Sequence, residues 1–208
     1  MYIIDFDDTL FDTHAFKEAR LKALKKIGVS PALFWTTYKN ARTNSNGVFT
    51  YSDKRHAEIL VSEGFDEDEV WKSLNKVTSK IKDFLIEDTE EFLQALKKLG
   101  QPMILLSLGD AEYQELKVKG CGIEKYFDRV FFVNETKEQT LKELFNVVHD
   151  ENIWLINDKV DESQQLKISF PDLQIVLKIS QAFPVDIYRK SGFTSFVYLN
   201  EILEYVRK

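Results

Sequence analysis

The chain begins with Met1-Tyr2-Ile3-Ile4-Asp5-Phe6-Asp7-Asp8-Thr9-Leu10, in which two carboxylates two residues apart follow a short apolar run. Side chains two apart leave a strand on the same side. A sharp turn after Phe6 would therefore let Asp5 and Asp7 overhang one crevice at the carboxyl edge of a sheet, where open α/β folds bind ligands. One carboxylate could then attack an electrophile while the other moves the proton. The alternative interpretation is an acidic surface turn in which Asp8 and Thr9 begin a helix.

The composition is that of an ordinary globular protein. The 208 residues are 44% hydrophobic and 30% charged, which is enough for one large domain or for a core with a small insertion. The net charge of -6 and the pI of about 5.2 argue against nucleic acid as a general partner. An anionic substrate would have to be attracted by local positive charge.

Cysteine content and hydropathy predict the compartment. Cys121 is the only cysteine of the sequence, which excludes an intramolecular disulfide and a zinc cluster and predicts a buried or half-buried thiol. No apolar run approaches the ~20 residues that span a bilayer, and no basic region followed by a long apolar stretch opens the chain. We therefore expect a cytoplasmic protein with no membrane partner.

Residues 14–85 have a helical pattern almost throughout. Apolar residues at helical spacing predict a helix that ends at Gly28, and Ser30-Pro31 supplies an N-cap followed by proline at the first helical position. The expected helices cover 15–27, 31–42, 52–62 and 66–85.

Strand-like and helix-like segments alternate after residue 86. The expected strands cover 102–107, 129–133, 153–156, 173–179 and 194–198. The expected helices cover 90–99, 111–118, 136–148, 161–168 and 200–206. This alternation is typical of a parallel sheet wrapped by helices. Because the helical block interrupts it after the first strand, we predict a core of residues 1–13 and 86–208 with residues 14–85 inserted as a helical domain.

The DxDxT pattern behind a short N-terminal strand resembles motif I of the haloacid dehalogenase (HAD) superfamily. The resemblance implies an α/β fold with a Rossmann-like parallel sheet core and an inserted all-helical C1 cap. In that family the first Asp becomes an aspartyl-phosphate and the second is the general acid/base. By position, Asp5 is the nucleophile and Asp7 the acid/base.

The family's three further motifs have counterparts in the same order. Motif II, a hydrophobic strand that ends in Ser or Thr, matches Ser107, whose hydroxyl would bind the phosphoryl group. Motif III, a lysine that holds the phosphoryl oxygens, matches Lys137, thirty residues later; Lys142 is the second choice. Motif IV, a strand that ends in acidic metal ligands, matches Trp154-Leu155-Ile156-Asn157-Asp158. Asp5, Asp7 through its backbone carbonyl, and Asp158 would then bind Mg²⁺, and either Asp161 or Glu162 would assist.

Three positions depart from the family's usual pattern. Asn157 stands where many relatives have Gly or Asp, Leu108 where Asn is frequent, and Glu138 where a large subgroup has Pro. None of these departures removes a charge that the chemistry requires, but they weaken assignment to a particular subfamily.

The resemblance implies a Mg²⁺-dependent phosphatase, a phosphoric monoester hydrolase, acting on a small phosphorylated metabolite. The alternatives are a phosphomutase of the same superfamily, or a catalytically silent binding or regulatory domain. The cap would select the substrate, through His14, the loop from Asn44 to Tyr51, and aromatic walls at Trp35, Tyr38 and Phe49. Aromatic residues at helical spacing are, however, more often the core of a cap than substrate contacts.

Overall fold

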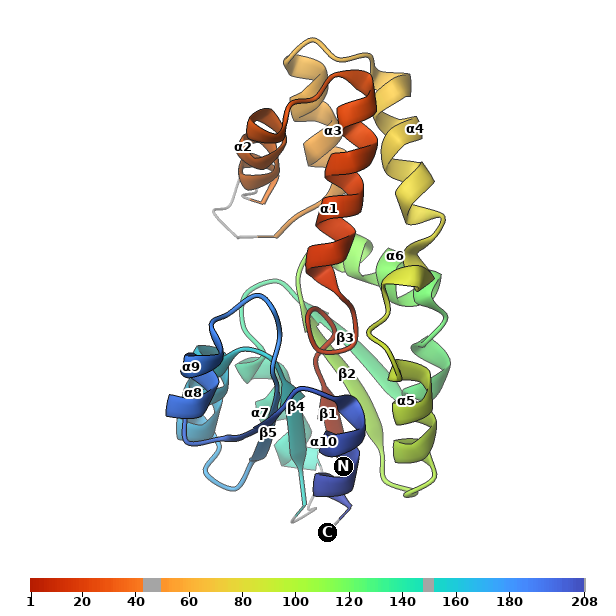
Figure 1. Ribbon diagram of the computed structural model, residues 1–208. Coiled ribbons are helices and arrows are strands. Elements are labelled where there is room, and N and C mark those ends of the chain that lie inside the picture. The colour runs from red at the N-terminus through yellow and green to blue at the C-terminus, as the bar shows by residue number, and fades with distance from the viewer. Residues whose placement is uncertain (43–49, 148–151, 208) are drawn as a thin grey trace.

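The computed structural model describes residues 1–42, 50–147 and 152–207. The described residues form a six-stranded parallel sheet in the order β3-β2-β1-β4-β5-β6 (Figure 1). The strands are β1 (Tyr2–Ile4), β2 (Met103–Leu108), β3 (Arg129–Val133), β4 (Trp154–Asn157), β5 (Gln174–Lys178) and β6 (Thr194–Phe196). This is the α/β fold with a parallel sheet that the alternating pattern predicted.

The short strand β1 lies at the centre of the sheet. Ile3 pairs with Ile104 of β2 on one side and with Leu155 of β4 on the other. A central strand in a parallel sheet is covered on both faces, which is why an unbroken apolar run forms it. The carboxyl ends of β1, β2 and β4 consequently meet at one edge, and the residues that follow them can share one site.

Helices cover both faces of the sheet. One face packs against α5 (Thr89–Lys97), α6 (Ala111–Cys121) and α10 (Leu199–Val206), and the other against α7 (Glu138–Val147), α8 (Val160–Ser169) and α9 (Val185–Lys190). Cys121, the last residue of α6, is a buried free thiol, as expected. The described residues contain no helix with the length and apolar character needed to cross a membrane.

Most of the residues between β1 and β2, those before α5, form a second group of helices beyond the carboxyl edge of the sheet (Figure 1). These elements are α1 (Thr13–Leu24), the 3₁₀ turn η1 (Lys25–Ile27), α2 (Pro31–Ala41), α3 (Asp53–Ser62), α4 (Glu67–Thr78) and the 3₁₀ turn η2 (Ile81–Phe84). They enclose a hydrophobic cluster of their own, built around Leu24, Phe34 and Leu74. We refer to this group, residues 13–84, as the helical cap.

Two local expectations differ from the structure. The helix expected over 66–85 ends at Thr78, and Ile81–Phe84 forms a separate 3₁₀ turn. The break lets Ile81 pack against Gly120 of α6, where a Cβ on residue 120 would overlap the Ile81 side chain. The sequence prediction also missed α9, because six residues after Pro184 are too few to show a helical period.

Candidate active site

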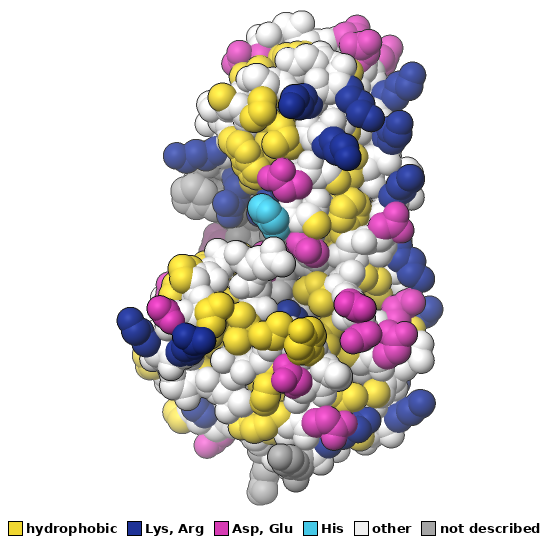
Figure 2. All heavy atoms as spheres, viewed as in Figure 1, with side chains coloured by type: hydrophobic (Ala, Val, Ile, Leu, Met, Phe, Trp, Pro, Cys, Tyr) yellow, Lys and Arg dark blue, Asp and Glu magenta, His cyan; other side chains and the backbone are white. Residues whose placement is uncertain are grey.

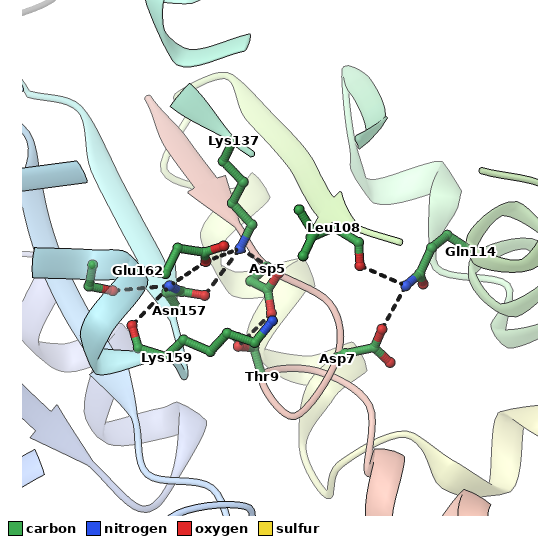
Figure 3. Close-up of polar contacts among 10 residues, drawn as sticks. Asp5, Asp7, Thr9, Leu108, Gln114, Lys137, Asn157, Lys159 and Glu162 are labelled. Carbon is green, nitrogen blue, oxygen red and sulfur yellow. Dashed lines mark hydrogen bonds and ion pairs between the residues drawn. The ribbon is translucent and has the colours of Figure 1, made fainter. Parts of the chain in front are cut away.

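Asp5 follows β1 directly and is almost fully buried. Its backbone N–H donates to the Ile156 carbonyl at 2.9 Å, which fixes the loop beside β4. One carboxylate oxygen accepts a hydrogen bond from Lys137 Nζ at 2.7 Å, and the other accepts one from Thr9 Oγ1 at 3.3 Å (Figure 3). Burial raises the pKa of Asp5 despite the opposing charge of Lys137.

Lys137 immediately precedes α7 and is the cation of this cluster. Its Nζ lies 2.7 Å from Asp5 Oδ1, 2.7 Å from Glu162 Oε2 and 3.2 Å from Asn157 Oδ1. Burial alone would lower the pKa of Lys137, but the two carboxylates outweigh burial and raise it. Lys142, the second choice for this role, is exposed and pairs with Glu138. The structure therefore brings Lys137, and not Lys142, to Asp5.

Asn157 and Glu162 hold Lys137 from the β4 side. Asn157 Nδ2 donates to Glu162 Oε2 at 2.9 Å and to Ser163 Oγ at 3.0 Å. Burial would raise the pKa of Glu162, but the charge of Lys137 lowers it, so Glu162 is an anion at neutral pH. Asp161 is exposed. Of the two acidic residues that the sequence could not separate, Glu162 is the one that reaches the cluster.

Two polar atoms beside this cluster lack hydrogen-bond partners among the described residues. They are Oγ of Ser107, near the end of β2, and Oδ1 of Asp158, which follows β4. Burial and then the charge of Asp5 raise the pKa of Asp158 to about 8. A buried polar group without a partner is costly, and such groups are retained where a ligand satisfies them. Both atoms are therefore available to a ligand.

The donor set fits a divalent cation. Among the described residues no three His, Cys, Asp or Glu side chains are grouped to hold a metal. Two carboxylates, Asp5 and Asp158, nevertheless repel each other across a buried site, and one Asp158 oxygen has no partner. With the backbone carbonyl of Asp7 they would make an all-oxygen set, and Mg²⁺ is held by one or two carboxylates together with substrate oxygens.

Asp7 lies in a different environment from Asp5. Its carboxylate turns toward α6, where it accepts from Gln114 Nε2 at 2.7 Å (Figure 3). It also accepts from Lys117 Nζ at 2.5 Å and from Thr13 Oγ1 at 2.9 Å. Burial would raise the pKa of Asp7, but the charge of Lys117 and these hydrogen bonds lower it to about 2. The two aspartates thus take part in two different hydrogen-bond clusters.

A cleft of about 160 Å³ separates the helical cap from the core beside Asp7. Tyr38 lines it, as expected of a cap wall, whereas the exposed Trp35 is not among its lining residues. His14 is exposed and lines a separate cavity with Asp8 and Asp12. Phe49 and residues 44–48, which were also expected to contact substrate, lie outside the described residues.

A family model for haloacid dehalogenase-like hydrolases matches residues 1–148. The chain belongs to this family. A comparison with curated protein sequences gives no significant match.

Solved structures resemble this hydrolase over nearly its whole length. A haloacid dehalogenase-like hydrolase from Burkholderia xenovorans has a TM-score of 0.74 at 17% identity, covering 98% of this chain and 94% of its own. A protein from Thermotoga maritima described as a beta-phosphoglucomutase has a TM-score of 0.66 at 18% identity, covering 99% and 97%. The HAD-hydrolase YfnB from Bacillus subtilis, solved with magnesium, has a TM-score of 0.65 at 15% identity, covering 100% and 98%. Other matched structures are described as dehalogenases. At these identities the likeness shows the fold.

Sequence reasoning missed two polar residues of this hydrolase, Gln114 and Lys117, which surround Asp7. They lie three residues apart on α6 and so share one helix face. Their burial was the missing information: Lys117 is only 3% exposed, and a buried lysine is nearly always paired. Composition and spacing do not show which lysine of a helix turns inward.

Proposed function

We propose that this hydrolase is a Mg²⁺-dependent phosphatase that hydrolyses a small phosphorylated metabolite through an aspartyl-phosphate on Asp5. The observation that carries the proposal is the arrangement around Asp5. A buried carboxylate contacts a buried ammonium, that of Lys137, while Ser107 Oγ and Asp158 Oδ1 have no partner among the described residues. This arrangement supplies a nucleophile, a cation and two ligand-binding oxygens at one sheet edge.

The first step transfers the phosphoryl group to Asp5. A carboxylate oxygen of Asp5 attacks phosphorus in line with the ester bond, which breaks as the new P–O bond forms. Lys137 and Ser107 bind the equatorial oxygens of the transferring group, where charge develops. The departing alcohol oxygen takes a proton from the acid form of Asp7. Because Asp7 is ionised while Lys117 binds it, this role requires Asp7 first to separate from Lys117 and take up a proton from solvent.

The second step releases phosphate. Asp7, again a carboxylate, removes a proton from a water molecule, and the resulting hydroxide attacks phosphorus. The bond between phosphorus and Asp5 breaks, which returns the Asp5 carboxylate and frees inorganic phosphate. The low pKa of Asp7 keeps it ionised at neutral pH, but it is a weak base while Lys117 and Gln114 bind it.

The residues that would hold Mg²⁺ are Asp5, Asp158 and the backbone carbonyl of Asp7. When bound, the ion offsets the charge repulsion between a carboxylate nucleophile and an anionic phosphate ester. Burial raises the pKa values of both Asp5 and Asp158, and the charge of Asp5 raises that of Asp158 further. A divalent ion bound by both carboxylates would therefore stabilise their ionised forms.

A phosphomutase would use the same residues, and a silent binding domain would keep the fold without turnover. The second carboxylate, Asp7, favours phosphoryl transfer over carbon–halogen hydrolysis, because a halide needs no proton in order to leave. The helical cap, with a cleft of only about 160 Å³, favours a small-molecule ester over a protein substrate.

The test is hydrolysis of p-nitrophenyl phosphate with and without Mg²⁺, by the wild-type protein, Asp5→Asn and Asp161→Asn. We expect metal-dependent release of p-nitrophenol that Asp5→Asn abolishes. Asp161→Asn is the matched control, since it removes an exposed carboxylate close in sequence to the same site.

Three other outcomes would contradict the proposal. Turnover of neither p-nitrophenyl phosphate nor a panel of phosphorylated metabolites would favour the binding domain. Turnover only with a bisphosphorylated activator would favour the mutase. Chloride release from 2-chloropropionate without phosphate release from any ester would favour a dehalogenase.

A further inference from the structure

The cleft between the helical cap and the core is richer in positive charge than the chain as a whole. Its lining includes five cationic side chains, in a protein whose net charge is -6. They are Lys17, Arg20, Arg42, Lys117 and Lys159. Figure 2 shows the surface hollowed where the cap meets the core, with Lys and Arg side chains along the cap side of the hollow.

Two of these cations are neutralised within the protein. Arg20 is almost fully buried and forms a two-pronged ion pair with Asp53, with its second nitrogen 2.6 Å from the carboxylate. Lys117 is bound to Asp7. These two side chains are therefore occupied by structural contacts.

The other three cations have no carboxylate within 4.0 Å among residues 1–42, 50–147 and 152–207. They are Lys17, Arg42 and Lys159. The nearest undescribed segment, residues 43–49, contains no Asp or Glu and cannot supply one. Lys159 follows Asp158 and extends toward Asp5 in Figure 3, so it faces the site of phosphoryl transfer. Lys17 and Arg42 belong to the cap.

Lys17 and Arg42 both line the cap side of the cleft, and they are close enough for their charges to interact. Lys17 is half-buried on α1, with Nζ 5.6 Å from the centre of the Tyr38 ring. Arg42 follows α2, and its charge affects both neighbours: it lowers the pKa of Lys17 and counteracts the effect of burial on Tyr38. Burial is the main cause of the lowered pKa of Lys17, and the charge of Asp8 opposes it, but no described carboxylate lies within 4.0 Å of either cation, so the two like charges still repel each other. An anion between them would remove that repulsion.

We propose that the substrate of this hydrolase carries a second anionic group, apart from its phosphoryl group, and that Lys17 and Arg42 bind it. This inference rests on the proposed phosphatase function and specifies its substrate class. The cleft runs from Asp7 and Asp8 to these two cations, so one small molecule could reach both ends. Its small volume favours a short phosphorylated acid or a compact bisphosphate.

The experiment compares esters that differ in the second group. Glycerol 3-phosphate and 3-phosphoglycerate are one pair, in which a carboxylate replaces a hydroxymethyl group. Fructose 1-phosphate and fructose 1,6-bisphosphate are the other. We expect kcat/KM to be about 10- to 100-fold higher for the doubly anionic member of at least one pair, because a charged hydrogen bond is worth about 1.5–3 kcal/mol. The pair that shows the preference identifies the second group as a carboxylate or a phosphate.

Lys17→Met and Arg42→Met should each reduce this preference about 10-fold, mainly through KM. Lys22→Met is the matched control, because Lys22 is exposed on the same helix and does not line the cleft; it should keep the wild-type preference. The same ratios can be measured as affinities with Asp5→Asn by calorimetry, which does not require turnover. A preference that survives both substitutions would overturn the inference.

Failure of this inference is distinguishable from failure of the proposed function. If p-nitrophenyl phosphate is hydrolysed but neither pair shows a preference, the phosphatase function stands and the second anion site is wrong. If no ester is hydrolysed, the phosphatase function fails, and calorimetry with the same pairs still decides whether Lys17 and Arg42 bind a second anionic group.

Discussion

Asp5 and Asp7 are two residues apart in sequence, yet their environments shift their pKa values in opposite directions. Asp5 accepts a hydrogen bond from Lys137, and burial raises its pKa. Asp7 accepts hydrogen bonds from Lys117, Gln114 and Thr13, which together lower its pKa to about 2. The chain turns between the two residues, so one carboxylate faces Lys137 while the other faces Gln114 of α6 (Figure 3).

The difference shows what a short motif can and cannot specify. Local sequence places both carboxylates at the carboxyl edge of the sheet. Their pKa values depend on burial and on residues more than a hundred positions away, Lys117 for Asp7 and Lys137 for Asp5. Pairs of acids whose environments separate their pKa values are typical of acid–base chemistry. The predictions below change one of the two environments at a time.

The largest effect is expected from Lys137→Met, which removes the cation from the Asp5 cluster. Asp5, which is buried, and Glu162, which is partly buried, would then lose the ammonium that contacts both, which costs about 3–5 kcal/mol at neutral pH. Activity should fall by about 10²- to 10³-fold. Urea denaturation and p-nitrophenyl phosphate hydrolysis measure the two effects, and Lys142→Met is the exposed control. Equal stability of both variants would mean that Asp5 does not depend on Lys137.

Lys117→Met tests the Asp7 cluster in the same way and should cost about 2 kcal/mol at pH 7. In the wild type the folded pKa of Asp7 is below its ordinary value of 3.8, so its contribution to stability is present above pH 4 and is lost as the pH falls toward 2. In the variant, burial is opposed only by the hydrogen bonds from Gln114 and Thr13, so the pKa of Asp7 should rise. In the wild type, the denaturation midpoint should fall as the pH is lowered from 4 toward 2 because Asp7 is protonated. In Lys117→Met, this contribution to the fall should be lost.

The control for this variant is Lys119→Met, on the same helix but exposed and paired with Glu115. It should leave the pH dependence of stability unchanged. NMR titration of the Asp7 carboxyl gives a second readout. A pKa that stays near 2 in Lys117→Met would assign the shift to Gln114 and Thr13 instead.

Glu162→Gln should have a smaller effect, since Lys137 keeps Asp5 as a partner. Without the Glu162 charge, the Lys137 ammonium could move away from the position in which it would bind the phosphoryl oxygens. We therefore expect kcat to fall about 10-fold. Asp161→Asn should retain wild-type kcat, because Asp161 is exposed. The reverse pattern would show that Asp161 serves the metal and that Glu162 does not serve Lys137.

Much of the fold was predictable from the sequence because its signals are local. The apolar run before Asp5, proline after Ser30 and the glycine at residue 28 each mark an element boundary that the structure has. The helix expected over 66–85 was wrong because a tertiary contact, Ile81 against Gly120, ends it early. A contact between residues thirty-nine positions apart leaves no periodic signal.

The residues of the candidate site likewise fall into those that local sequence predicts and those that only the folded structure reveals. Asp5, Ser107, Lys137 and Asp158 follow or adjoin strand ends, so a sheet edge could be expected to gather them. Lys117 and Lys17 lie within helices, where the sequence does not distinguish an inward lysine from an exposed one. Their importance follows from burial and from neighbours that only the folded chain brings close.

The smallest effect is expected from Gly109→Ala, which disturbs the Asp7 cluster indirectly. A Cβ on residue 109 would overlap the side chain of Gln114, which donates one of the hydrogen bonds to Asp7. Displacing Gln114 should cost about 1 kcal/mol and raise the pKa of Asp7 slightly, while Lys117 keeps the carboxylate ionised. A double-mutant cycle with Gln114→Ala locates the cause. If the overlap is responsible, Gly109→Ala should cost much less in the Gln114→Ala background. An equal cost in both backgrounds would assign it to the backbone at residue 109, and would leave Lys117 and Thr13 as the residues that separate Asp7 from Asp5.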